Sequence, residues 1–92
     1  MECGVYILQS FKNNKYYIGS TNDIKRRLGE HNKGYVLSTK KLRPWTLKVF
    51  VKCNDLAEAK GSEYRLKQYK RRDIIEKVVM DSKFPWDYNL PA

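Results

Sequence analysis

The segment at residues 45–52 constrains the fold more than any other part of the chain. It reads WTLKVFVK, and its side chains alternate with a period of two. Such alternation is typical of a β-strand that buries one face. It predicts that one face carries Trp45, Leu47, Val49 and Val51 and that the other carries Thr46, Lys48, Phe50 and Lys52. Pro44 comes just before this strand and favours an extended backbone at Arg43.

Two shorter strands are expected near the N-terminus. Residues 3–8 read CGVYIL and residues 15–19 read KYYIG, and both segments are rich in β-branched and aromatic side chains. The polar stretch at residues 9–14 between them indicates an antiparallel hairpin. Because side chains alternate along a strand, Gly4, Tyr6 and Leu8 share one face. Tyr6 and Tyr17 are therefore candidate neighbours across the hairpin.

Three helices are predicted from capping signals and apolar spacing. The first covers residues 23–31, follows the capping side chains at residues 20–22, and ends before Gly34. The second opens with Asp55 and Glu58 as a capping box and runs to about Lys70. The third covers residues 72–80. We expect one domain over residues 1–80 and a C-terminal tail at residues 81–92 that packs back irregularly or extends from the domain.

The net charge of +9 over 92 residues favours a polyanionic partner. Nucleic acid is the first candidate, an anionic membrane surface is the second, and a basic protein without such a partner is the third. Residues 33–53 contain no acid. The six cations of this segment are Lys33, Lys40, Lys41, Arg43, Lys48 and Lys52. Such a cluster is typical of a surface that follows phosphates.

The sequence disfavours several other classes of protein. Cys3 and Cys53 do not have metal-ligand spacing, and we expect both to be free thiols in a reducing compartment. The absence of a signal peptide or long apolar run predicts a cytoplasmic protein without a membrane segment. The five glycines are isolated, so no phosphate-binding loop of the Walker type is present. No Ser, His and Asp combination suggests an acyl-transfer triad.

Glu63 is an anomaly in the second predicted helix. It falls on the same helical face as Leu56, Ala59 and Leu66. A carboxylate on an apolar face needs a cation, because an unpaired buried charge is costly. One interpretation is an ion pair with a lysine or arginine, or a partly exposed position at the boundary of the core. The other is a divalent-metal site with one carboxylate, in which water and substrate phosphate complete the ligands, as is common for Mg²⁺.

Arg27 and His31 lie four residues apart in the first predicted helix and so project to the same side. Such a pair is often only a solvated basic face. It also suits a phosphoryl-transfer site, where a guanidinium stabilises charge and a histidine relays a proton. His31 is the only histidine, which excludes a metal site with several histidine ligands.

Four segments together resemble the GIY-YIG endonuclease superfamily. They read GVY at residues 4–6, YIG at residues 17–19, KRRLGEHN at residues 25–32 and AEAKGSEYRLK at residues 57–67. The chain is similar to the small single-domain members, and the resemblance covers residues 3–79. It implies an α/β (α+β) fold in which a small three-stranded antiparallel sheet is flanked by about three helices. It also implies a nuclease domain like that of the bacterial excision-repair incision subunit or of structure-specific endonuclease catalytic subunits.

The resemblance assigns roles to particular residues. It implies that Tyr6, Tyr17, Arg27 and His31 belong to the catalytic site and that Glu63 binds Mg²⁺ or Mn²⁺. In the implied hydrolysis of a DNA phosphodiester, Tyr6 activates or orients water, helped by His31, and Arg27 stabilises the developing charge. Because an unperturbed tyrosine titrates near ~10, a base role requires that its pKa be lowered.

The chain departs from the family pattern at three places. Its first signature reads GVY instead of GIY, Ser20 stands where some relatives have a lysine, and Asn89 is only a loose counterpart of an asparagine in relatives. The DNA contacts that we expect from the basic segments are Arg26, Lys33, Lys40, Lys41 and Arg43.

We expect little sequence specificity and a preference for branched, nicked or damaged DNA. Two alternatives remain open. One is a non-catalytic nucleic-acid-binding module, or a subunit that is active only within a repair complex. The other is a protein-interaction subunit that docks a larger repair factor through the FPWDY segment at residues 84–88.

Overall fold

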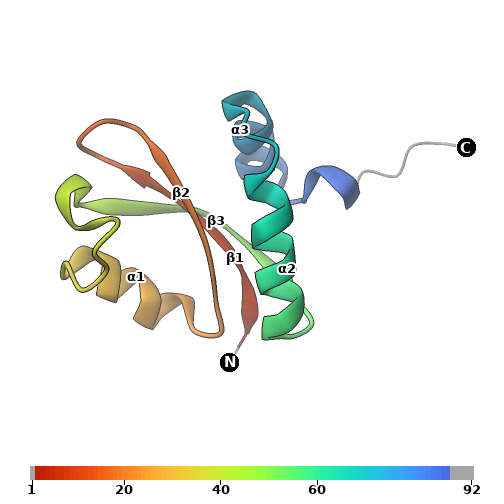
Figure 1. Cartoon of the computed structure of the whole chain (residues 1–92), viewed down its shortest axis with the longest axis horizontal. Helices are drawn as coiled ribbons and strands as arrows, with labels where there is room; N and C mark the ends of the chain where they lie inside the picture. Colours follow the sequence, from red (N-terminus) through yellow and green to blue (C-terminus); the bar gives the residue numbers. More distant parts are fainter. Residues whose placement is uncertain (1, 88–92) are drawn as a thin grey trace, which may run out of the picture.

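The computed structural model describes residues 2–87, which form a three-stranded antiparallel sheet with helices on both faces (Figure 1). The strands are β1 (Cys3–Ser10), β2 (Tyr16–Thr21) and β3 (Trp45–Cys53), in the order β2-β1-β3. The helices are α1 (Ile24–Asn32), α2 (Leu56–Lys67) and α3 (Arg72–Asp81), with short 3₁₀ turns η1 (Lys40–Leu42) and η2 (Pro85–Asp87). The expected α+β architecture is therefore confirmed.

The central strand β1 divides the core between the two faces of the sheet. Val5 and Ile7 point into the core that α2 and α3 cover, whereas Tyr6 and Leu8 point toward α1. All four side chains are essentially inaccessible to solvent. The predicted alternation of β1 is thus confirmed, and Tyr6 is directed away from the larger aliphatic core.

The strict alternation predicted for residues 45–52 is wrong, because β3 contains an irregularity at Lys48. Ile7 lies opposite Val49, but the next residue of β1, Leu8, lies opposite Leu47, which leaves Lys48 without a partner. An extra residue in one strand reverses the faces on either side of it. Trp45, Leu47 and Phe50 therefore pack on the α1 side, and Val49, Val51 and Cys53 pack on the α2 and α3 side.

The predicted cap of α2 is confirmed, whereas the cap of α1 is Asp23 and not one of the side chains at residues 20–22. Asp23 caps α1 by accepting a hydrogen bond from the backbone N–H of Arg26 at 3.1 Å. Asp55 caps α2 in the same way, and Glu58 reaches back to the backbone N–H of Asn54 at 3.4 Å. The end of α2 at Lys67 is about one turn earlier than predicted. No helix within residues 2–87 is long and apolar enough to span a bilayer.

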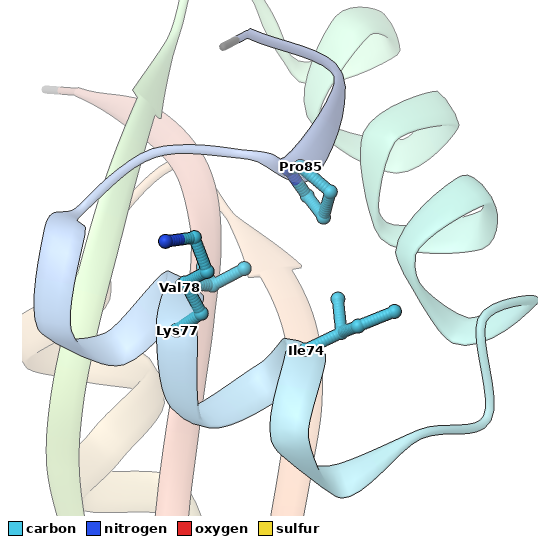
Figure 2. Close-up of a pocket in the computed structure, with 4 residues that line it drawn as sticks. All are labelled: Ile74, Lys77, Val78 and Pro85. Atoms are coloured by element: carbon cyan, nitrogen blue, oxygen red, sulfur yellow. The ribbon is translucent and has the colours of Figure 1, made fainter.

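The segment after α3 folds back over the helical layer. Phe84 is buried in the same core as Val78, and Trp86 stacks on Phe84 with ring centroids 4.7 Å apart. Figure 2 shows a small apolar pocket between α3 and this segment, where Pro85 faces Ile74 and Val78 and Lys77 lies at the rim. Asn89 and the end of the FPWDY segment lie outside the described residues.

The two cysteines are free thiols in the structure, as expected. They lie opposite each other in the pairing of β1 with β3, although fifty residues separate them in the chain. Cys53 is buried beside α2 and Cys3 is partly accessible.

Candidate active site

Four of the predicted site residues meet on the α1 face of the sheet. Tyr6 comes from β1, Tyr17 from β2, and Arg27 and His31 from α1. The ring centroids of Tyr6 and Tyr17 are 6.4 Å apart, which confirms that the two tyrosines are neighbours. The imidazole of His31 lies edge-on to both rings, 5.6 Å from Tyr6 and 5.1 Å from Tyr17.

A line of hydrogen bonds runs through this cluster. Arg27 Nε donates to the Tyr6 hydroxyl at 3.3 Å, and the same hydroxyl lies 2.8 Å from His31 Nε2. His31 Nδ1 lies 2.7 Å from the hydroxyl of Thr39, which donates to the carbonyl of Val36 at 3.4 Å. One arrangement of protons satisfies every group: Tyr6 donates to Nε2, and Nδ1–H donates to Thr39. The structure therefore favours a neutral His31 with its proton on Nδ1.

Burial controls the electrostatics of this line. His31 is fully buried, and desolvation lowers its pKa to about 4, with a further lowering from the positive charge of Arg27. Burial also raises the pKa of Tyr6, because desolvation outweighs the hydrogen bond and the charge of Arg27. The expected histidine titrating near neutral pH is therefore wrong for this arrangement: at pH 7 His31 is a neutral acceptor and Tyr6 a protonated donor.

Thr39 is a site residue that the sequence did not single out. It is fully buried although it lies in the polar loop between α1 and β3. Its hydroxyl contacts His31, and its carbonyl accepts a hydrogen bond from Trp45 Nε1 at 2.9 Å. Asn32 clamps the backbone of Trp45 through both its amide oxygen and its amide nitrogen. A threonine in a polar loop carries no signal in a single sequence that marks it as buried.

The close approach of Tyr6 to β2 explains the glycine of the YIG signature. Gly19 lies opposite Tyr6 in the strand pairing, and the Tyr6 ring and hydroxyl occupy the space where a Cβ at residue 19 would lie. Any larger residue at this position would displace the ring. Gly19 is therefore a structural requirement for the hydrogen bond from Tyr6 to His31.

Glu63 reaches the site from the opposite face of the sheet. Ser20 follows Gly19 in β2, so its side chain points to the α2 face, where its hydroxyl donates to Glu63 Oε1 at 2.5 Å. Lys67 donates to Glu63 Oε2 at 2.5 Å and lies 5.9 Å from the centre of the Tyr17 ring. The ion-pair interpretation of Glu63 is confirmed, with Lys67 as its partner. The site thus extends around the edge strand β2.

The oxygen donors at Glu63 also fit a hard divalent cation. No group of three or more His, Cys, Asp or Glu side chains within residues 2–87 could hold a metal together. A cation at this site would therefore have the Glu63 carboxylate as its acidic ligand and the neighbouring Ser20 hydroxyl as a second oxygen. Mg²⁺ is often bound by one or two carboxylates while it keeps water and phosphate ligands. Lys67 competes for the same carboxylate, but its side chain is 45% exposed and free to swing away.

A polar recess opens beside Arg27. Its lining includes Ser20, Asn22 and the cationic residues Arg26, Arg27 and Lys60. Lys60 lies one turn before Glu63 on α2, and its helical spacing from Glu63 is the sequence signal that relates it to the site. A recess with several cations next to a carboxylate is suited to a phosphate group and a metal ion.

The predicted DNA contacts divide into two groups. Lys33, Lys40, Lys41 and Arg43 are exposed in the segment between α1 and β3, and none forms an ion pair with a residue in the described part of the chain. Arg26 differs, because it pairs with Glu30 at 3.1 Å and Asp23 at 3.9 Å. Its role as a DNA contact stays a prediction, as do those of the other four.

We expect Gly19→Ala to disrupt the site and Gly61→Ala to leave it intact. A Cβ at residue 19 collides with Tyr6, whereas one at residue 61, in the interior of α2, meets no neighbour. Overpacking should lower the free energy of unfolding by about 2 kcal/mol at Gly19, while alanine at Gly61 should raise it by about 0.5–1 kcal/mol. Urea denaturation measures both changes. Equal stability of the two variants would contradict the close packing of Tyr6 on β2.

We expect stability to fall between pH 6.5 and pH 4 because of His31. In this range an unfolded histidine takes up a proton, whereas the buried side chain stays neutral until about pH 4. Protonation therefore favours the unfolded chain, at a cost of about 3 kcal/mol in unfolding free energy below pH 4. Urea midpoints measured across this range should show a steeper fall for wild type than for His31→Gln, which has no titrating ring. Parallel pH profiles would show that His31 is not buried in the neutral state.

The family model of the GIY-YIG catalytic domain matches residues 2–77. A structure-specific endonuclease subunit SLX1 from Candida dubliniensis is 53% identical over 55 residues, covering 52% of this chain and 19% of the fungal protein. A UPF0213 protein from Halobacterium salinarum is 37% identical over 68 residues, covering 73% of this chain and 87% of that protein.

The match to the fungal relative thus spans about a fifth of that protein's length. No solved structure gives a significant match to the chain. The family match includes both tyrosine signatures, the helix with Arg27 and His31, and the helix with Glu63. The chain therefore belongs to the GIY-YIG family.

Proposed function

We propose that the protein is a divalent-metal-dependent endonuclease that hydrolyses phosphodiester bonds in DNA. The observation that carries this proposal is a polar recess beside β2 that both Arg27 and Ser20 line. Arg27 comes from α1, and the Ser20 hydroxyl donates to the Glu63 carboxylate on α2. Membership of a family of catalytic domains supports it, as does the name of the fungal relative, a structure-specific endonuclease subunit.

In this proposal the scissile phosphate occupies the recess and Arg27 stabilises the negative charge that grows on its oxygens. A Mg²⁺ or Mn²⁺ ion held by Glu63, with Ser20 beside it, would supply Lewis-acid stabilisation of the same charge. Tyr17 forms part of the wall between the two halves of the site, with its ring between His31 and the Lys67 ammonium.

We expect Tyr6 to orient and activate the attacking water once Arg27 turns toward the bound phosphate and uncovers the Tyr6 hydroxyl, which solvent does not reach in the free protein. The water gives a proton to the Tyr6 oxygen as Tyr6 passes its own proton to His31 Nε2. The water oxygen bonds to phosphorus as the bond to the sugar oxygen breaks, and the leaving sugar oxygen takes a proton from solvent. Bound phosphate offsets the charge of Arg27, which is one cause of the low pKa of His31. Substrate binding therefore makes His31 a better proton acceptor than it is in the free protein.

The preferred substrates are expected to be branched, nicked or damaged DNA, cut with little sequence preference. The described domain has one sheet, and its exposed cations would contact phosphates, which do not encode sequence. A protein partner that directs the enzyme to its substrate agrees with the name of the fungal relative, which is a subunit. DNA repair is the process that we expect such an enzyme to serve.

A second function is favoured by the ion pair of Glu63 with Lys67. Because Lys67 occupies one carboxylate oxygen, the isolated chain has a metal ligand that is already neutralised. This arrangement suits a nucleic-acid-binding module, or a subunit whose site forms only within a larger repair complex.

Cleavage assays separate these functions. Labelled flap, nicked, single-stranded and plain duplex DNA are incubated with Mg²⁺, Mn²⁺ or EDTA and with wild type, Glu63→Gln or Glu2→Gln. The control carboxylate Glu2 pairs with Lys52 at the surface and does not line the recess. We expect metal-dependent cleavage that falls roughly 100-fold or more in Glu63→Gln and is unchanged in Glu2→Gln. Binding without cleavage by wild type in every condition would favour the non-catalytic function.

Tyr6→Phe tests the proton-transfer role. The substitution keeps the ring over Gly19 and removes only the hydroxyl that contacts Arg27 and His31. We expect cleavage to fall by about 10²- to 10⁴-fold, as is typical for the loss of a general acid–base group, while affinity for DNA in EDTA is retained. Single-turnover rates and anisotropy titrations give the two quantities. Unchanged cleavage rates would assign water activation to another group.

A further inference from the structure

A second concave surface lies on the α2 and α3 face, alongside the edge strand β2. We call it the β2–α3 groove. Five cationic side chains line it: Lys15, Lys67, Lys70, Arg71 and Arg72. It is separate from the basic segment at residues 33–43, which lies beyond α1, on the other face of the sheet (Figure 1). None of our sequence predictions included this groove as a binding surface.

The groove has more positive than negative charge. Lys67, Arg71 and Arg72 each pair with an acid of their own helix or turn, namely Glu63, Asp73 and Glu76. Lys15 and Lys70 are exposed and form no ion pair with any residue in the described range 2–87. Two unpaired lysines on opposite rims, backed by three exposed cations, favour a ligand with several negative charges.

The floor of the groove is apolar and aromatic. Ile18, Leu66 and Ile75 form its base, and the Arg72 guanidinium lies 4.6 Å from the centre of the Tyr16 ring. A duplex presents mainly phosphates and sugar edges to a protein surface, whereas an unpaired strand also offers base faces that stack on aromatic or guanidinium planes. The pocket in Figure 2 is a useful contrast, because its one cation is Lys77 and its charge does not specify a polyanion.

The position of the groove connects it to the candidate active site. Lys67 lines the groove and also holds Glu63, and Tyr16 and Ile18 alternate along β2 with Tyr17 and Gly19. A strand that leaves the recess around the β2 edge would therefore enter the groove directly.

We propose that the β2–α3 groove binds a single-stranded nucleic-acid segment next to the cleaved bond, with Lys15 and Lys70 contacting its phosphates. This inference rests on the proposed function for the identity of the ligand, and it deepens that function by naming an unpaired strand as the part of the substrate held there.

The test is the binding of a fluorescein-labelled oligothymidylate in EDTA, measured by anisotropy over a range of salt concentrations. The variant is Lys15→Gln with Lys70→Asn, since asparagine tolerates the positive φ of residue 70. The matched control is Lys77→Gln with Lys83→Gln, which removes the same charge from exposed positions outside both the groove and the basic segment at residues 33–53. We expect weaker binding only for the groove variant, with a slope of log affinity against log salt that is smaller by about 1.4.

Two results would overturn the proposal. One is an equal loss of affinity in the groove variant and in the control. The loss would then depend on the net charge of the protein and not on the position of the lysines. The other is an equal loss for a hairpin duplex and for the single strand, which would assign the groove to duplex DNA. Cleavage of nicked duplex with Mg²⁺ tests the proposed function separately. If wild type cleaves the nicked duplex but the groove variant keeps its affinity for the single strand, only the proposal for the groove is rejected. If the groove variant loses affinity but wild type does not cleave, only the proposed nuclease function is rejected.

Discussion

The candidate site depends on the contact between the Tyr6 ring and the backbone of Gly19. Without a side chain at residue 19, the ring crosses β2 and its hydroxyl reaches both Arg27 and His31. Every buried side-chain nitrogen or oxygen within residues 2–87 has a hydrogen-bond partner. Because an unpaired buried polar group costs about 1–3 kcal/mol, the line from Arg27 to Thr39 fixes both the position and the proton of His31. The packing of one glycine thus determines the chemistry of a histidine twelve residues later.

Much of this arrangement follows from local sequence patterns. The alternation in residues 3–8 placed Tyr6 opposite the aliphatic face, helical spacing paired Arg27 with His31, and Glu63 was anomalous on its own helix. The irregularity at Lys48 could not be predicted, because it depends on how β3 aligns with β1. Thr39 was missed because its contact with His31 also comes from tertiary packing. Lys67 was missed for another reason, since its i,i+4 spacing from Glu63 is shared by many surface lysines on helices.

The edge position of β2 explains how a thin sheet brings together groups from two layers. Consecutive residues of a strand point to opposite faces, so Gly19 receives Tyr6 on the α1 side while Ser20 contacts Glu63 on the α2 side. In a central strand these two groups would be separated by neighbouring strands. At an edge the only barrier between them is β2 itself, and a ligand can reach both from solvent.

The charged groups of the site are neutralised by neighbours in the free protein. Arg27 pairs with Glu30 at 3.2 Å, and Glu63 pairs with Lys67 one helical turn away. Solvent-accessible pairs at this spacing contribute only about 0.3–0.5 kcal/mol, so a phosphate or a cation can replace them at little cost. The buried Tyr6–His31 hydrogen bond is different, because it cannot be exchanged for water. In the proposed mechanism the site therefore combines a rigid proton-transfer pair with two charges that substrate and metal would release on binding.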